Sequence, residues 1–144
     1  MSGLLAGWDW FDKRLQSTLA ARGFPALNKT QSMMMMYISA GVQRPIDIAR
    51  RMRLSKQAIR HVSEQLAKIG YIKITEHPDD KRGRHIAFHE DSLEAREVAV
   101  EIIDDLEQEL ARKIGADDVK VLKRILQLDW EAPDSGKAFG RKAG

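Results

Sequence analysis

The sequence contains no cysteine, which excludes disulfide bonds, thiolate metal sites and cysteine-based redox switches. It also lacks any apolar run of about 18 residues, the length that a membrane-spanning helix needs. Its first residues do not combine a basic start with a long apolar stretch, so no secretory signal is predicted. These absences predict a soluble, cytoplasmic protein with no membrane partner. With 144 residues, 43% of them hydrophobic, the chain can form one compact domain with a buried core.

The charged residues are unevenly distributed along the chain. Residues 44–85 carry 11 Lys and Arg against 5 Asp and Glu, a net charge of +6, whereas residues 86–131 carry 6 against 13, a net charge of −7. A basic segment beside an acidic one is typical of a nucleic-acid binder whose other parts face elsewhere. Long solvated helices are also often charged, so the charge pattern alone leaves the function open.

Four consecutive methionines, residues 33–36, form the one low-complexity stretch of the sequence. Asn28 and Gln31 precede them as a capping box, which predicts that the run lies inside a helix. Successive helical residues point about 100° apart, so the four sulfur atoms cannot form one cluster. Core packing together with Tyr37 is the favoured interpretation. The alternatives are the lining of a small-molecule cavity and a metal-binding or oxidation-sensing role.

Two short helices followed by a β-hairpin are predicted between residues 45 and 88. Pro45 suits the first turn of one helix, and Ser55 is a good N-cap for the next. Alternation of period two over residues 71–75 and 84–88 then predicts two strands around a Pro/Asp/Gly turn. The buried face of the second helix is predicted from apolar residues at spacings of 3, 4 and 3, namely Ile59, Val62, Leu66 and Ile69. This order of elements is a winged helix-turn-helix.

Helices are also predicted on both sides of this motif, over residues 1–22 and 90–128. Their apolar stripes are more than one small domain should expose, which favours a homodimer. The stripes comprise Leu4, Trp8, Phe11 and Leu15 at one end of the chain and Ile103, Leu106, Leu110 and Leu126 at the other.

The predicted fold class is mainly α with a small β-hairpin, a winged helix-turn-helix with N- and C-terminal dimerisation helices. We expect a single domain over residues 1–131. Within it, residues 27–89 would form the DNA-binding lobe, and residues 1–22 and 90–128 the dimerisation helices. The Pro- and Gly-rich residues 132–144 are expected to form a flexible tail.

The second helix of such a motif places its first residues against base edges in the major groove. Arg and Lys match guanine, Gln matches adenine, and Ser can bond a phosphate. Basic side chains at a hairpin tip can enter a minor groove. A merely solvated surface helix is the alternative. The predicted DNA contacts are Ser55, Lys56, Gln57, Arg60 and His61 in the helix and Lys81, Arg82 and Arg84 in the hairpin. Asp80 would hold Arg82 or Arg84 through a carboxylate–guanidinium pair.

From about residue 27 to residue 93 the sequence resembles the MarR family of bacterial winged-helix regulators. "LNKTQ" looks like the start of that family's second helix, and "DIARRMRLSKQAIRHVSEQLAKIGYI" is similar to its helix-turn-helix. "HPDDKRGRHIAF" resembles its wing, in which an Asp-x-Arg pair, here Asp80 and Arg82, steadies the loop. The chain departs from the family pattern at Arg53, where Gly is common in the turn, and at Arg44, where a capping Ser or Thr is usual. Arg44 is therefore a further candidate for a phosphate contact.

The resemblance implies a two-fold dimer on double-stranded DNA, with recognition helices about 34–36 Å apart on a pseudo-palindromic operator. We therefore predict a sequence-specific transcription regulator, more often a repressor than an activator in such an arrangement. A small-molecule effector bound between the dimerisation helices and the lobe could change the half-site spacing and release the DNA. Its cavity is assigned to Trp8, Phe11, Met34 and Tyr37, although core packing explains the same residues.

Two other classes of function are alternatives to a DNA-binding transcription regulator. A winged-helix protein-interaction module without specific DNA binding would favour apolar residues on the outward helix face, where Lys56 and Arg60 stand instead. An enzyme is the weakest alternative, because no Gly-rich phosphate loop follows a predicted strand and no catalytic residue is identified. His77, His85 and His89 near the wing suggest zinc, but further ligands with tetrahedral reach are not evident. No metal or cofactor is predicted.

Overall fold

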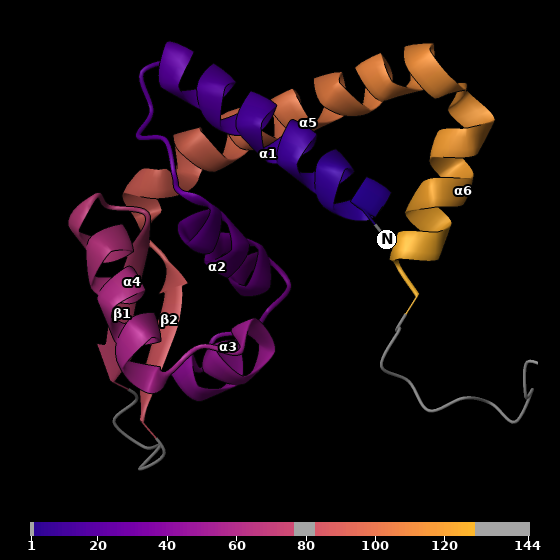
Figure 1. The fold of residues 1–144 in the computed structure, drawn as a ribbon. Coiled ribbons are helices and arrows are strands. Elements are labelled where there is room, and N and C mark those ends of the chain that lie inside the picture. Colours follow the sequence, from indigo (N-terminus) through magenta and orange to yellow (C-terminus); the bar gives the residue numbers. More distant parts are fainter. Residues whose placement is uncertain (1, 77–82, 129–144) are drawn as a thin grey trace, which may run out of the picture. The chain divides into compact units, whose positions relative to one another are not determined.

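The structure is a computed structural model, and it describes residues 2–76 and 83–128. The chain divides into two compact units, residues 1–106 and 107–144. The prediction of a mainly α fold with a small β-hairpin is confirmed (Figure 1). In chain order, the elements of the described ranges are α1 (Ser2–Ala21), α2 (Lys29–Ser39), α3 (Pro45–Met52), α4 (Lys56–Lys68), β1 (Ile72–Glu76), β2 (Arg84–Phe88), a 3-10 turn η1 (Glu90–Ser92), α5 (Leu93–Ile114) and α6 (Ala116–Leu126).

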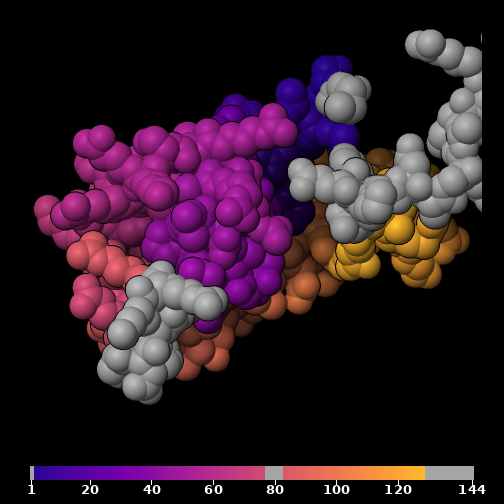
Figure 2. Space-filling view, turned by 90° about the horizontal axis from the view of Figure 1, so that it is seen from below, coloured from indigo at the N-terminus to yellow at the C-terminus, as the bar shows by residue number. Residues whose placement is uncertain are grey.

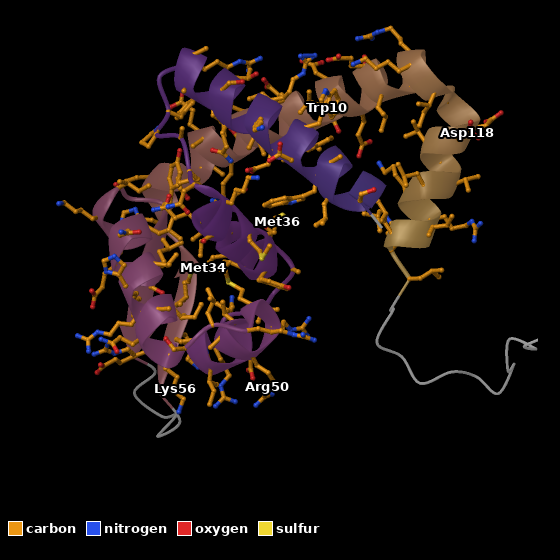
Figure 3. The ribbon with its side chains drawn as sticks, in the orientation of Figure 1. Trp10, Met34, Met36, Arg50, Lys56 and Asp118 are labelled. Atoms are coloured by element: carbon orange, nitrogen blue, oxygen red, sulfur yellow. The ribbon has the colours of Figure 1, made fainter. Side chains whose placement is uncertain are left out.

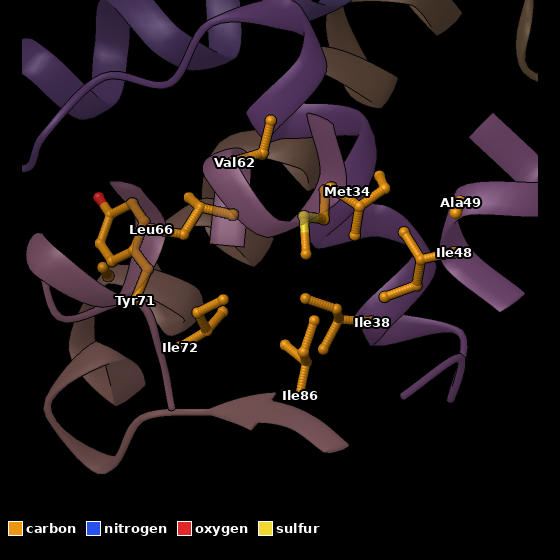
Figure 4. Packing of buried hydrophobic residues seen from close by; sticks show 11 residues of the cluster. Met34, Ile38, Ile48, Ala49, Val62, Leu66, Tyr71, Ile72 and Ile86 are labelled. Atoms are coloured by element: carbon orange, nitrogen blue, oxygen red, sulfur yellow. The ribbon is translucent and has the colours of Figure 1, made fainter. Parts of the chain in front are cut away.

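The helix-turn-helix and the hairpin enclose the main hydrophobic core. Helices α2, α3 and α4 pack against one another and against the two strands, and their side chains meet between these elements (Figure 4). The core consists of Met34, Ile38, Ile48, Ala49, Ile59, Val62, Leu66, Tyr71, Ile72, Ile86 and Ala95. Burial of this apolar surface is what holds α4 and the hairpin in a fixed relation.

The methionine run lies within α2, and its members do have different environments. Met34 is fully buried in the core, Met35 is half-buried against it, and Met36 is 56% exposed. Met34 has no exposed surface and packs in the core, and its role in a ligand cavity stays a prediction. The flexible thioether chain fills the irregular space between helices.

The hairpin is antiparallel, with Ile72 opposite Phe88 and Ile74 opposite Ile86. It is also fastened to the helical part of the lobe. The backbone N–H of Ile86 donates to the carbonyl oxygen of Gln43 in the α2–α3 loop at 2.8 Å. This bond fixes the position of β2 relative to the loop that precedes α3.

The turn of the helix-turn-helix contains a strained residue. Arg53 ends α3 with φ 52° and ψ 41°, the one non-glycine residue with positive φ in the described ranges. The left-handed conformation suits glycine because a Cβ crowds the backbone there. Arginine at residue 53 therefore makes this turn less favourable than glycine would.

Replacing Arg53 by glycine is expected to raise the free energy of unfolding by about 0.5–1 kcal/mol, because relief of strain outweighs the added freedom of the unfolded chain. The thermal midpoint should rise by about 2–4 °C. Arg51→Gly is the matched control: that exposed residue lies inside α3, so glycine there should lower the midpoint instead. A lower midpoint for Arg53→Gly would contradict the strain.

The first unit also contains a second hydrophobic cluster, formed by α1 and α5. Leu19, Ile102 and Leu106 are buried in it, and Phe11 and Leu15 pack against it. Part of the apolar stripes predicted to form a dimer contact therefore packs inside the first unit. The pattern of apolar residues alone could not distinguish these two uses.

A buried polar network joins α1 to α2. The carboxylate of Asp12 is buried and accepts a hydrogen bond from the Ser32 hydroxyl at 2.7 Å. Gln16 accepts from the backbone N–H of Leu27 at 2.7 Å. A buried carboxylate needs such donors, and no buried side-chain polar atom lacks a partner in the part of the chain that is described.

The second unit, described as far as residue 128, buries little apolar surface of its own. Val119 is its one buried residue in that range. The Nζ of Lys123 donates to Glu107 at 2.6 Å and thereby ties α6 to the C-terminal half of α5. Several large apolar side chains are exposed instead, namely Ile114, Val121, Ile125, Leu126 and Leu128. No helix in the described residues is both long and apolar enough to cross a membrane.

Candidate nucleic-acid interface

The recognition helix α4 begins at a side-chain cap and turns a polar face outward. The hydroxyl of Ser55 accepts a hydrogen bond from the backbone N–H of Ala58 at 3.1 Å, which satisfies one of the free donors of the first turn. Ile59 and Val62 are buried and hold the helix to the core. The side chains predicted to contact DNA, Ser55, Lys56, Gln57, Arg60 and His61, are all exposed.

Three predicted cations come together at one end of the lobe. Arg44, Lys56 and Arg84 line a pocket of about 290 Å³, together with Pro45 and Ile46 among the described residues. We call it the basic pocket. Figure 2 looks onto this end of the lobe and shows α3 and α4 beside the hairpin on one surface. In Figure 3, Lys56 lies at the same end as Arg50 of α3.

The three cations of the basic pocket come from different segments. Arg44 is the N-cap of α3, Lys56 is the first residue of α4, and Arg84 is the first residue of β2. Among the described residues, no acidic side chain lines the pocket, although Glu76 lies 3.5 Å from the Nε of Arg84. Converging cations beside a helix N-terminus attract an anion such as a phosphate group.

Arg44 caps α3 with its backbone only, because its side chain makes no capping hydrogen bond. Arg44→Ser should therefore supply the missing cap and raise the free energy of unfolding by about 0.5–1 kcal/mol. The same change removes a cation from the basic pocket and should weaken DNA binding. Arg44→Ala is the control, with weaker binding and no gain in stability. A serine variant that binds DNA as well as the wild type would argue against a phosphate contact by Arg44.

Two residues in the second turn of α4 have partners one turn further along. The Nε of Arg60 donates to Glu64 at 2.8 Å, and the Nε2 of Gln65 lies 3.0 Å from the Nε2 of His61. The hydrogen bond from Arg60 holds the pKa of the Glu64 carboxyl below its ordinary value, and the charge of Arg60 adds to the effect. Glu64 and Gln65 were not among the predicted site residues, although their spacing of four from Arg60 and His61 was the available signal.

The other predicted site residues lie outside the described part of the chain or are partly buried. Lys81, Arg82 and the wing residue Asp80, like the tail 132–144, lie outside the described residues. Trp8, Phe11 and Tyr37 are partly buried, and their role in a ligand cavity stays a prediction. In the described part of the chain, no group of three or more His, Cys, Asp or Glu residues could hold a metal ion.

Comparisons with known proteins agree with this geometry. Residues 28–83 match the family model of the MarR family, and a search of curated proteins finds no match. The solved structure of NadR in complex with 4-hydroxyphenylacetate is similar, with a TM-score of 0.65, 14% identity and 86% of each chain covered.

Two further solved structures share the fold. A mutant MarR from E. coli complexed with operator DNA has a TM-score of 0.62 and 21% identity over 86% of this chain and 89% of that chain. A mutant MepR from S. aureus has a TM-score of 0.62 and 17% identity over 88% and 93%. The segment matched by the family model contains α2, α3, α4 and β1 and ends at residue 83, before β2. Residues 28–83 therefore match the MarR family model, and the chain as a whole shares its fold with these solved structures.

Proposed function

We propose that this protein is a sequence-specific DNA-binding transcription regulator that acts as a homodimer on a pseudo-palindromic operator and represses by occupying a promoter. The observation that carries the proposal is the basic pocket, where Arg44, Lys56 and Arg84 converge beside the start of the recognition helix. Phosphate groups are the anions that DNA presents at every step, and contacts to them fix the register of a protein on the duplex.

The residues of α4 would then read the bases. With a phosphate in the basic pocket, the first turns of α4 enter the major groove, where Gln57 matches adenine and Arg60 matches guanine. Both side chains are exposed on the outward face of the helix. Phosphate contacts thus supply affinity and position, and these two side chains supply sequence preference.

The exposed apolar residues of the second unit support the homodimer. Ile114, Val121 and Leu126 are each more than 40% exposed, and surface of this kind is typical of an association face. A two-fold dimer presents two recognition helices to the same side of the duplex, which is why the operator should be a pseudo-palindrome.

Release by a small-molecule effector is a further part of the proposal. One solved structure with the same fold is that of NadR in complex with 4-hydroxyphenylacetate. An effector would act here by favouring a dimer whose half-site spacing does not match the operator. Trp8, Phe11 and Tyr37, which are partly buried, are the residues proposed to line its cavity.

Selection of bound fragments from random DNA, followed by titration of a fluorescent copy of the selected site, tests the proposal. The affinity should fall steeply as the salt concentration rises, because binding releases counterions from the phosphates. A scrambled duplex of the same length should bind at least about 1000-fold more weakly. Absence of binding at low salt, or equal affinity for the scrambled duplex, would contradict the proposal.

A further inference from the structure

An acidic residue lies on the outward face of α4, among side chains that the proposed function turns toward DNA. The side chain of Glu64 is 53% exposed, and it stands four residues after Arg60. A carboxylate near the duplex repels phosphate groups. Its presence on a helix that reads DNA therefore needs a reason.

The geometry of the Arg60–Glu64 contact suggests a reason for the acidic residue on this face. Glu64 Oε1 accepts from the Nε of Arg60 at 2.8 Å, and no other hydrogen bond to this guanidinium is found within residues 2–76 and 83–128. A guanidinium carries five N–H donors. With the Nε–H engaged, the two Nη groups are left for another partner, and these are the groups that match the O6 and N7 acceptors of guanine.

We infer that Glu64 is a positioning residue, which holds the Nε of Arg60 and so presents its two Nη groups to a guanine in the major groove. The inference rests on the proposed function and deepens it. An arginine side chain has many rotamers in solution, and a partner that selects one before binding reduces the entropy lost on contact with the base. The hydrogen bond from the guanidinium in turn lowers the pKa of the Glu64 carboxyl.

The side chain of His61, next to Arg60, is also held by a residue one turn further along, the amide of Gln65. The Nε2 of Gln65 lies 3.0 Å from the Nε2 of His61, and the Oε1 of Gln65 accepts from the Nε2 of Gln31 at 3.2 Å. Because an amide nitrogen only donates, the His61 nitrogen accepts. The guanidinium of Arg60, which only donates, thus pairs with the carboxylate of Glu64. The accepting imidazole nitrogen of His61 pairs with the amide of Gln65. Both side chains of this turn are oriented from one turn further along.

The test compares Glu64→Gln, which keeps the size of the side chain and removes its charge, with Glu76→Gln. The control removes the same charge from β1, where Glu76 faces Arg84. Affinities are measured for the selected operator and for copies with one guanine replaced by 7-deazaguanine, which lacks the N7 acceptor. The guanine read by Arg60 is the one whose replacement no longer weakens binding in Arg60→Ala.

At that guanine, Glu64→Gln should reduce the penalty for 7-deazaguanine by about 3- to 10-fold, whereas Glu76→Gln should keep the wild-type penalty. Both variants should bind random DNA slightly more tightly, because each loses a negative charge. An unchanged penalty in Glu64→Gln, or an equal reduction in Glu76→Gln, would overturn the inference.

Other outcomes separate the inference from the proposed function. If Arg60→Ala discriminates at every guanine as the wild type does, the inference fails while the protein remains a site-specific DNA binder. If the wild-type protein selects no site at all, the proposed function fails and the inference with it. A pair that only stabilises the helix would change the thermal midpoint in Glu64→Gln and leave the guanine penalty unchanged.

Discussion

Replacing Arg44, Lys56 and Arg84 together by glutamine is expected to lower the affinity for the selected operator about 100- to 1000-fold near physiological salt. These three side chains line the basic pocket, and each is proposed to neutralise a phosphate. The slope of log affinity against log salt should become shallower by about one for each lost cation per bound protomer. Fluorescence anisotropy over a range of salt concentrations measures both quantities.

A matched control removes the same charge elsewhere in the first unit. Lys13, Arg22 and Lys68 are exposed, and none of them lines the basic pocket. Their joint replacement by glutamine should change the affinity far less and leave most of the salt dependence intact. An equal loss in both triple variants would show that net charge, rather than the pocket, determines binding.

Replacing Val121 and Leu126 together by lysine is expected to convert the proposed dimer into monomers and to lower operator affinity about 100-fold or more. These side chains on α6 are 46% and 49% exposed, and a buried charge at an apolar interface is costly to desolvate. The affinity falls because each lobe then binds its half-site alone. Sedimentation velocity gives the oligomeric state, and titration of the operator gives the affinity.

The choice of lysine separates the two explanations for weaker binding. An added cation attracts DNA, so a lower affinity cannot come from charge repulsion. Gln127→Lys, at the C-cap of α6, adds a cation without replacing an apolar side chain and should leave both the dimer and the affinity unchanged. A double variant that stays dimeric, or a wild type that is monomeric at micromolar concentration, would refute the proposed association face.

Features that depend on a few neighbouring residues could be read from the sequence. The capping box of Asn28 and Gln31 forms with hydrogen bonds of 2.9 and 3.0 Å, and Ser55 caps α4. In each case the partners lie within four residues in the chain, so that local backbone geometry decides the contact.

Features that depend on contacts between distant segments could be predicted only in part. Phe11 and Leu15 were assigned to a dimer contact, yet they pack on the buried Leu106 of the same unit. An apolar stripe shows that a helix face will be covered, but the pattern does not specify what covers it. The ion pair between Glu76 and Arg84 was not predicted, because these residues meet only once the strands pair.

By itself, the sequence determined the order of helices and strands, their caps and the basic character of the lobe, because these follow from short-range periodicity and charge. Only the tertiary structure decided that Met34 fills the core while Met36 is exposed. It alone also brought Arg44, Lys56 and Arg84 into one pocket. Those outcomes depend on how the helices and the hairpin pack to bury their shared core, and that packing joins residues far apart in the chain.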